Sequence, residues 1–531
     1  MQKRAVGVFC AIMLMLGVML TRVAALGSGD TLAQAAEVQS SRTMTVLTER
    51  AYIYDRYMRP LVNRVSSVCA VVFPGLADGA LLSRLAAGSE EYSALVSAGA
   101  PFSVREAPEW LSGRGIYRFA AHERYDGNQA AAHLIGYTRD GEGVYGAELA
   151  FDEFLSTHGR SVSITYTADG TGSVLKNSAP EVTLGGNDSA DGVILTIDCE
   201  LQRRAEKALS RRLASGAAVV MNVRTGEILA AASCPTFDIN DLSASAADER
   251  LPFLNRAFAA WPVGSTFKLL VAGAALDSGY STDWEYTCTG ATDVHGKSFA
   301  CHWAYGHGKI DMVTALKFSC NPYFINLALS LGSGRIREDA ENLGFGVRDV
   351  FADGWETADG HLQSESELAN PADVANFAFG QGTLAATPVQ LAKLIAAIAN
   401  GGYAVTPKLW LGTLEDGRLT ETPVCAQNRV FSEDTTAMLR AMMAEVVEEG
   451  SGTAARPVAG GAGGKTASAQ TGRFREDGTE VVEAWFAGFW PAVEPRYAIV
   501  VLAEGMDSGG EWAAPVFRDI ANGLYALYGG A

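Results

Sequence analysis

Two residues three positions apart, Ser265 and Lys268, have the side chains that nucleophilic acyl transfer requires. A serine hydroxyl is a poor nucleophile until a base removes its proton, and lysine can be that base when burial or a second cation lowers its pKa. On a helix, the two side chains lie one turn apart on the same face. A turn at residues 261–264 precedes them and the apolar run KLLVAGAALDSG follows. We therefore expect Ser265 at a helix N-terminus, where backbone N–H groups favour developing negative charge.

The same Ser-x-x-Lys spacing occurs a second time, at Ser173 and Lys176. That copy follows Asp169 and Gly170 in a stretch typical of a hairpin. Positions i and i+3 of a strand point to opposite faces, so this serine and lysine could not act together. We therefore choose Ser265 as the candidate nucleophile. Taken alone, its motif also fits an N-cap serine followed by a solvated lysine.

Two further motifs follow in chain order, Ser319-Cys320-Asn321 and Lys465-Thr466. A serine in the first could relay protons, and its asparagine could hold a substrate amide. A lysine and a hydroxyl on an edge strand could bind a carboxylate. The bland alternatives are a helix-end turn and a surface cation on a hairpin. The ordered set of three motifs favours a single catalytic site over three unrelated features.

The N-terminus carries an uncharged apolar run at residues 5–20, preceded by Lys3 and Arg4. About 20 apolar residues cross a membrane as a helix, and Arg22 can extend to the far interface. We expect a membrane anchor over residues 1–26 with its leading end in the cytoplasm. The alternative is a cleaved signal peptide, because small residues stand near the end of this segment. Both interpretations place the rest of the chain outside the cytoplasm.

The cysteines leave the redox state open. Of eight, Cys10 lies in the anchor, and the other seven cannot all pair within a monomer. Cys288 and Cys301 are the candidates for a disulfide, because only a short polar stretch separates them; two reduced, buried thiols are the alternative. His302 and His307 lie nearby, but their spacing is a weak metal signal, and no clustered Cys/His motif is present. We therefore expect no metal ligands and no cofactor.

Composition and charge bound the remaining classes. Hydrophobic residues make up 48% and charged residues 19% of the chain, which is ordinary for globular domains. The net charge of −18 argues against nucleic acid as a partner, because phosphates demand basic surfaces. The 531 residues suffice for two or three domains.

The texture of the chain changes near residue 190. Residues 27–44 are small and polar and indicate a linker, and short strand-like runs with no catalytic constellation follow over 45–190. From 191 to 531, strand-like runs at both ends enclose a long, Ala-rich helical region. This pattern predicts an α+β domain with a mainly antiparallel sheet flanked by helices.

With these motifs in view, the sequence resembles the monofunctional, or class B, penicillin-binding proteins, which carry this motif set. The resemblance includes the segments NRAFAAWPVGSTFK and FGQGTLAATPVQLA around the site, and TERAYIYDRYMRPLV and GVYGAELAFDEFL in the N-terminal part. It covers nearly the whole chain after the anchor. It implies a penicillin-binding transpeptidase domain on a β-rich, dimerisation-like pedestal at 45–190.

The resemblance also implies how the chemistry proceeds. Ser265 attacks the carbonyl between two D-alanines of a peptidoglycan stem peptide, and Lys268 accepts its proton. Ser319 and Lys465 help to protonate the leaving D-alanine. An amine of a neighbouring strand then takes the acyl group, whereas a β-lactam leaves the serine acylated.

Substrate binding follows from the same resemblance. Asn321 binds the peptide backbone, and Lys465 with Thr466 holds the terminal carboxylate. The backbone N–H groups of Ser265 and Ser468 form the oxyanion hole. The implied setting is the cell membrane, with a single anchor, an extracytoplasmic catalytic domain and a polytopic glycosyltransferase as partner.

The third motif departs from the family pattern. The usual Lys-Thr-Gly has Ala467 in place of the glycine that keeps the strand edge clear for the ligand. This methyl group leaves three alternatives to a transpeptidase: a D,D-carboxypeptidase, a β-lactamase, or a non-catalytic penicillin-binding receptor or scaffold. The sequence does not distinguish a role in elongation, division or sporulation.

Overall fold

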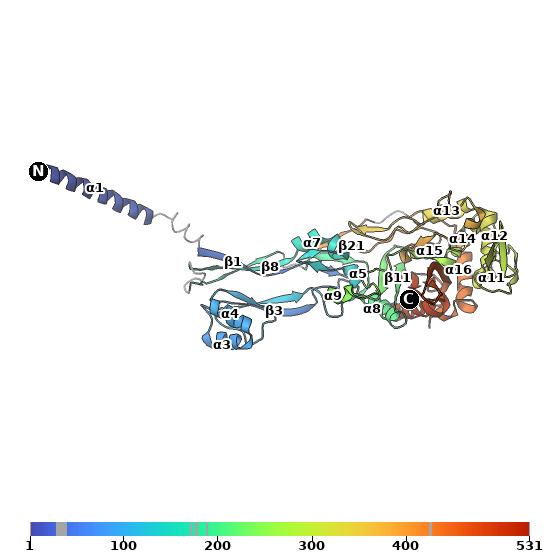
Figure 1. Ribbon diagram of the computed structural model, residues 1–531, viewed down its shortest axis with the longest axis horizontal. Coiled ribbons are helices and arrows are strands. Elements are labelled where there is room, and N and C mark those ends of the chain that lie inside the picture. Colours follow the sequence, from blue (N-terminus) through green and yellow to red (C-terminus); the bar gives the residue numbers. More distant parts are fainter. Residues whose placement is uncertain are drawn as a thin grey trace. The chain divides into compact units, whose positions relative to one another are not determined.

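The computed structural model describes residues 2–27, 40–169, 173–175, 179–186, 190–423 and 427–529, which form two compact units (Figure 1). Unit 1 comprises Met1–Arg50, Arg64–Arg124 and His158–Asp188. Unit 2 comprises Ala51–Asn63, Tyr125–Thr157 and Ser189–Ala531.

The apolar N-terminal run forms one helix, α1 (Gln2–Gly27), none of whose side chains is buried. Its 26 residues correspond to a length of about 39 Å, more than the hydrocarbon thickness of about 30 Å. Among the described residues, α1 is the one helix long and apolar enough to cross a membrane.

Unit 1 is built from two three-stranded antiparallel sheets and a helix pair. Its elements are β1 (Ser41–Glu49), β8 (Arg160–Thr167) and β9 (Glu181–Gly185) in the first sheet, β4 (Phe102–Val104), β3 (Val65–Val72) and β5 (Ile116–Glu123) in the second, and helices α3 (Gly79–Gly88) and α4 (Glu90–Ala98). Alternate residues of β3 enter two cores: Val72 packs with Leu85 of α3, whereas Val71 packs with Ile164 of β8. The strand alternation thus joins the helices and both sheets.

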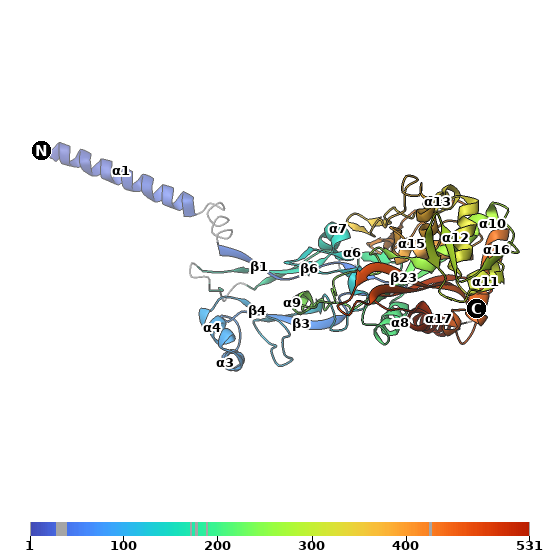
Figure 2. The same cartoon turned by 45° about the vertical axis from the view of Figure 1, so that its right-hand side comes forward.

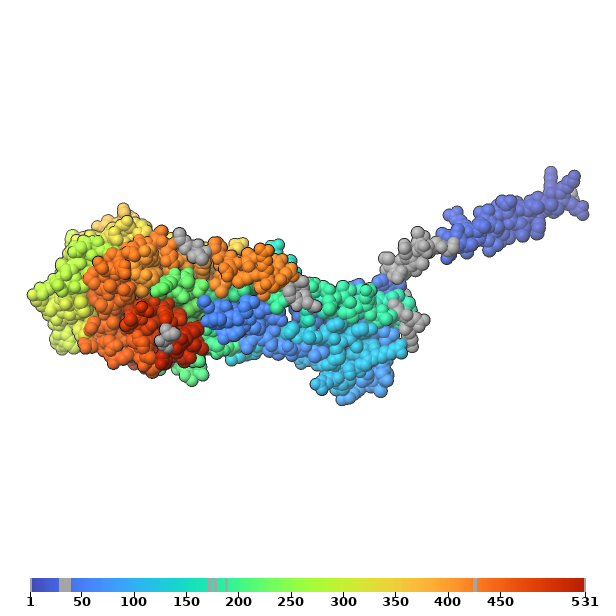
Figure 3. All heavy atoms as spheres, turned by 180° about the vertical axis from the view of Figure 1, so that it is seen from behind, coloured from blue at the N-terminus to red at the C-terminus, as the bar shows by residue number. Residues whose placement is uncertain are grey.

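Unit 2 contains a five-stranded antiparallel sheet, and this confirms the predicted α+β class. Its strand order is β12 (Ile228–Cys234), β11 (Gly216–Asn222), β25 (Tyr497–Ala503), β24 (Glu480–Trp490) and β23 (Gly463–Phe474). Strands from the start and the end of this unit pair directly, as in Val219 with Val500. Segments distant in sequence consequently lie side by side on its surface (Figure 3). The strand β23 lies at the edge of the sheet (Figure 2).

Helices cover both faces of this sheet. Val219 and Val500 enter the core shared with α10 (Lys268–Asp277), α12 (Asn321–Leu331), α15 (Pro388–Ala399) and α16 (Glu433–Glu449). Their neighbours Val220 and Val501 enter the opposite core, shared with α8 (Cys199–Ser210) and α17 (Ala514–Tyr528). α15 begins with a capping box between Thr387 and Gln390, and all twelve of its residues are buried.

Shorter elements complete unit 2 around this frame. They are β2 (Tyr52–Tyr54), α5 (Ala132–Ile135), β6 (Thr138–Arg139), β7 (Glu142–Gly143), α6 (Gly146–Ala150), α7 (Asp152–Thr157), β10 (Gly192–Leu195), α9 (Leu242–Ala246), α13 (Ser333–Asn342), β18 (Val350–Ala352), β19 (Trp355–Glu356), α14 (Pro371–Ala378), β21 (Trp410–Glu415) and β22 (Arg418–Glu421).

The division between the units differs from the single boundary expected near residue 190. Ala51–Asn63 and Tyr125–Thr157 belong to unit 2, because β2 pairs in parallel with β10 and Ile53 enters the main core of that unit. The fully buried Asp55 carboxylate fastens the first segment. It accepts hydrogen bonds from Arg59 Nε at 2.6 Å and from the backbone N of Cys199, which begins α8, at 3.2 Å.

The Asp55 contacts predict a stability effect far from the catalytic motifs. Asp55→Asn removes the charge that faces Arg59 and replaces an acceptor by an amide donor. We expect the free energy of unfolding to fall by about 2–4 kcal/mol, measured by urea denaturation followed by circular dichroism. The matched control Asp248→Asn breaks only the surface pair with Arg250 and should leave the unfolding curve nearly unchanged. Equal curves for both variants would contradict this role of Asp55.

Candidate active site

Ser265 lies in a single 3₁₀ turn, η1 (Gly264–Phe267), and α10 begins three residues later at Lys268. The serine therefore stands just before the α-helix, close to the predicted helix start. Gly264 has φ +56°, and its N–H donates to Gly380 O at 2.9 Å. A Cβ at Gly264 would lie 3.0 Å from the Cβ of Ala469 on β23. The turn thus requires glycine because it packs directly against the edge strand and the Gly-Gln-Gly segment.

Hydrogen bonds fix the chain that leads into this turn. Trp261 Nε1 donates to Arg256 O at 3.1 Å, and Trp485 Nε1 on β24 donates to Pro262 O at 2.9 Å. Trp261–Pro262 forms β13, which pairs with β20 (Ala385–Ala386). Thr266 Oγ1 donates to Val263 O at 2.8 Å within the turn. The turn is therefore held from the sheet on one side and from the Gly-Gln-Gly segment on the other.

Lys268 is fully buried and its Nζ has three oxygen partners. These are Ser319 O at 2.8 Å, Ser319 Oγ at 3.2 Å and Asn321 Oδ1 at 2.7 Å. Burial lowers the pKa of Lys268 to about 7, against a smaller opposite effect of the nearby Cys320 and Cys301 thiols. A neutral lysine is therefore accessible near pH 7. In the part of the chain that the structure describes, the Ser265 hydroxyl itself makes no hydrogen bond, and catalytic contacts of this kind often tighten only with substrate.

The Ser-x-Asn motif forms the turn between α11 (Met312–Lys317) and α12. Ser319 has φ +56°, a conformation that is uncommon for residues other than glycine and that occurs at functional sites. This conformation lets both its carbonyl and its hydroxyl face Lys268. Asn321 Nδ2 donates to Ala300 O at 3.2 Å, so the asparagine is held from a second strand region as well.

Lys465 and Thr466 lie on β23, on opposite faces of the edge strand. Lys465 is fully buried, and its Nζ donates to Thr466 O at 2.9 Å. Burial, helped by the charge of Lys268, lowers the pKa of Lys465 well below its usual value. Thr466 Oγ1 shares a 2.7 Å hydrogen bond with the hydroxyl of Ser451. Repulsion between the two buried lysines disfavours a state in which both are charged.

A cavity of about 290 Å³ brings the three motifs together. Its wall contains the predicted residues Ser265, Ser319, Asn321, Thr466 and Ser468. Lys268 and Lys465 are fully buried and do not form part of this wall. The size is close to the lower limit of pockets that hold small ligands.

The cavity wall also contains residues that the motifs did not reveal. They come from separate loops and share no sequence pattern: His302, Phe318, Ser451, Ser508, Gly509 and Gly510. Ala467 belongs to the wall too, and its side chain, 4% exposed, lies on the same face of β23 as Lys465. Its methyl group therefore takes up room at the site, on the side of the strand that faces η1.

Other candidates do not share this geometry. Ser173 is exposed beside the bridge between Ala168 and Val174 in unit 1, which fits the expected hairpin, and Lys176 lies outside the described residues. A larger cavity of about 400 Å³ in unit 2 is lined by Trp490, Tyr497 and other residues, none from the three motifs.

Comparison with known proteins agrees with this site. The family model of the penicillin binding protein transpeptidase domain matches residues 216–522, from β11 to α17. The chain is 28% identical to stage V sporulation protein D of Bacillus subtilis, over 93% of this chain and 80% of that protein. It is 28% identical to the peptidoglycan D,D-transpeptidase FtsI of Escherichia coli K12, over 97% of this chain and 90% of that protein.

A solved structure shows the same fold. It is the complex between PBP2 and MreC from Helicobacter pylori, with a TM-score of 0.68 and 21% identity over 92% of this chain and 99% of that one. Because the family model covers more than half of the sequence and these relatives extend over nearly all of it, the chain belongs to the penicillin-binding protein transpeptidase family, among its class B members.

Proposed function

We propose that this protein is a membrane-anchored serine D,D-transpeptidase that crosslinks peptidoglycan stem peptides and is acylated by β-lactams. One observation carries the proposal: a buried lysine, Lys268, whose Nζ is hydrogen-bonded to Ser319 and Asn321, lies one turn from a cavity-lining serine, Ser265. The names of the relatives support the substrate class. No metal or organic cofactor enters these steps.

The first step forms an acyl-enzyme. Ser265 Oγ attacks the carbonyl carbon between the two D-alanines, and its proton passes to the neutral Nζ of Lys268. The N–H groups of Ser265 and Ser468, both on the cavity wall, hold the oxyanion. When the C–N bond breaks, the leaving amine of D-alanine takes a proton through Ser319 Oγ, which lies 3.2 Å from Lys268 Nζ. Lys465 supplies positive charge behind this relay.

The second step transfers the acyl group to an amine. The amine of a neighbouring stem peptide attacks the ester carbonyl, gives up a proton to Lys268, and releases Ser265. Asn321 orients the peptide backbone, and Thr466 with Lys465 holds the terminal carboxylate of the donor. A β-lactam has no departing D-alanine, so its acyl group stays on the serine.

The cellular setting completes the proposal. α1 is an uncleaved single-span anchor, Lys3 and Arg4 stay in the cytoplasm, and both units lie outside it. Residues 45–190 serve as the pedestal domain and 191–531 as the catalytic domain. A polytopic glycosyltransferase supplies the glycan strands. That a protein of the same fold was solved in complex with MreC supports a protein partner in general.

A second candidate function rests on Ala467. Its methyl group narrows the cavity wall and favours a receptor that binds β-lactams without turnover. A hydrolytic enzyme, either a D,D-carboxypeptidase or a β-lactamase, differs only in that water takes the acyl group. Crosslinked product from lipid-linked substrate supports the transpeptidase; rapid product release without an acceptor amine supports a hydrolase; labelling without turnover supports the receptor.

The nucleophile is tested by labelling with a fluorescent penicillin. Ser265→Ala should lower the labelling rate by at least about a thousandfold, because it removes the attacking oxygen. Ser173→Ala, a matched change in the other Ser-x-x-Lys copy, should label like wild type. Loss of label in the Ser173 variant alone, or labelling of Ser265→Ala, would contradict the assignment.

The buried base predicts a pH dependence. Lys268 acts in its neutral form, and its pKa is lowered to about 7. The second-order acylation rate should therefore rise about tenfold per pH unit below pH 7 and level off above it. The midpoint belongs to Lys268 and Lys465 together, because their charges interact. Lys207→Gln, an exposed lysine on α8, is the control that keeps this profile; a flat wild-type profile would rule out a lysine base.

The methyl group of Ala467 predicts a gain of rate. Ala467→Gly should speed acylation roughly fivefold, since one methyl group at a pocket wall is worth about 1 kcal/mol. The same change should lower stability by about 0.5–1 kcal/mol, because glycine is flexible within a strand. Stopped-flow acylation and thermal unfolding measure the two effects. An unchanged rate would show that the alanine does not obstruct the ligand.

A further inference from the structure

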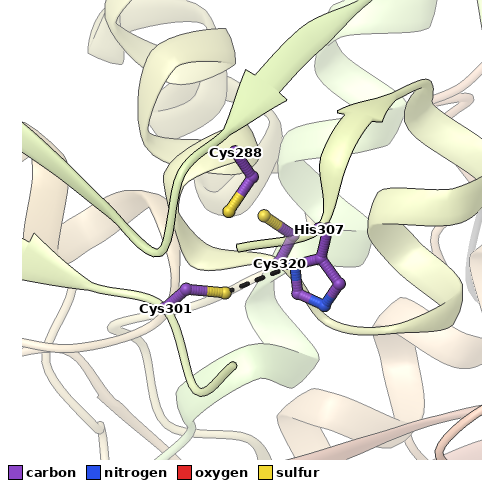
Figure 4. A group of neighbouring side chains, drawn as sticks. All are labelled: Cys288, Cys301, His307 and Cys320. Carbon is purple, nitrogen blue, oxygen red and sulfur yellow. Dashed lines mark hydrogen bonds between the residues drawn. The ribbon is translucent and has the colours of Figure 1, made fainter. Parts of the chain in front are cut away.

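Four potential metal ligands converge beside the active site: Cys288, Cys301, His307 and Cys320 (Figure 4). Their donor atoms all lie within 4.8 Å of one another. They come from four places in the chain, at the end of β14 (Tyr286–Cys288), just after β16 (Lys297–Ala300), just before β17 (Gly308–Ile310), and at the N-cap of α12. The wide sequence spacing explains why no metal motif was expected.

The distances fit one tetrahedral ion. Zinc binds sulfur at about 2.3 Å and histidine nitrogen at about 2.0–2.1 Å, so neighbouring ligand atoms stand about 3.5–3.8 Å apart. Cys301 Sγ and His307 Nδ1 are 3.5 Å apart. Three sulfurs and one imidazole nitrogen form a donor set typical of structural zinc.

The surroundings also fit a closed site. The three cysteines are at most 6% exposed, and His307 is half-buried. Pairing of Cys288 with Gly308 in the β14–β17 ladder brings His307 next to the first ligand. Cys301 N donates to Gly290 O at 2.8 Å, and Gly306 lies so close to Cys288 O that a Cβ would stand 2.3 Å from it. The loop is therefore folded tightly around the ligands.

We propose that Cys288, Cys301, His307 and Cys320 bind one structural zinc ion. The ion closes the loop of residues 288–308 onto the start of α12. His302 is not a ligand: its Nδ1 lies 3.9 Å from Cys301 Sγ, and its exposed ring lines the catalytic cavity.

The ion positions the Ser-x-Asn turn, an effect that rests on the proposed function. Cys320 stands between Ser319 and Asn321, whose oxygens hold Lys268. Asn321 Nδ2 in turn donates to Ala300 O, and the next residue is the ligand Cys301. A metal bond to Cys320 therefore holds Ser319 in its positive-φ conformation from the side opposite to Lys268.

The competing arrangement is a disulfide between two of these thiols. Outside the cytoplasm neighbouring thiols are prone to oxidise, and Cys288 with Cys301 is the pair that the sequence suggested. In the structure all seven described cysteines are free, including these two. Zinc binding would protect three adjacent thiols from oxidation.

The test is metal content of the full-length, detergent-solubilised protein. Wild type should carry about one zinc ion per chain by plasma mass spectrometry after dialysis. His307→Ala and Cys320→Ser should carry almost none. The matched controls His302→Ala and Cys234→Ser should keep the wild-type amount. Wild type refilled with Co²⁺ should give the intense visible bands of a tetrahedral thiolate site, a readout that needs no variant.

Several outcomes would overturn the site. These are wild type that binds no zinc even when it is supplied, a Cys288–Cys301 disulfide in the peptide map, or zinc loss in His302→Ala but not in His307→Ala. Acylation is a separate readout. Removing zinc with a chelator should slow penicillin labelling at least about tenfold, and zinc should restore it. Unchanged labelling of zinc-free protein would overturn the positioning effect alone, whereas absent labelling with zinc bound would overturn the proposed function alone.

Discussion

Lys268 Nζ has exchanged water for three oxygen atoms of the Ser319–Asn321 turn, and the catalytic half of the molecule depends on this exchange. A buried ammonium group needs partners, so the turn that supplies them must be held rigidly. The positive φ of Ser319 is the conformation that presents two oxygens at once. The same burial brings the lysine pKa near neutrality. One contact therefore sets both the geometry and the basicity of the site.

The sheet extends this constraint to the nucleophile. The turn that carries Ser265 contacts the edge strand β23 through Gly264 and Ala469, and β23 also carries Lys465. The edge strand leaves one side free of strand partners, where an extended peptide can be added. The second buried lysine lies on the face of this strand that packs against η1. Nucleophile, base and carboxylate site are thus referred to one rigid strand.

Local patterns sufficed to predict much of this arrangement. Alternating and helical periodicities predicted β11, β12, α15 and α17, and helix context distinguished Ser265 from Ser173. Contacts between distant segments were out of reach. The Cys288–Cys320 group is spread over four elements, and Ser451 approaches Thr466 only in the folded chain. Likewise, nothing local indicated that Ala51–Asn63 joins unit 2, because its partner strand β10 lies far along the chain.

The pairing of β11 with β25 has a consequence for the order of folding. Val219 and Val500 come from opposite ends of the catalytic sequence, so the central strand pair cannot form until almost the entire chain has left the ribosome. Until then the β11–β12 hairpin exposes an unpaired edge and an apolar face. The dominance of such long-range contacts predicts slow folding. A chain that is to be exported benefits from this delay, because it stays threadable until its last strands arrive, and a truncated product never acquires a closed sheet.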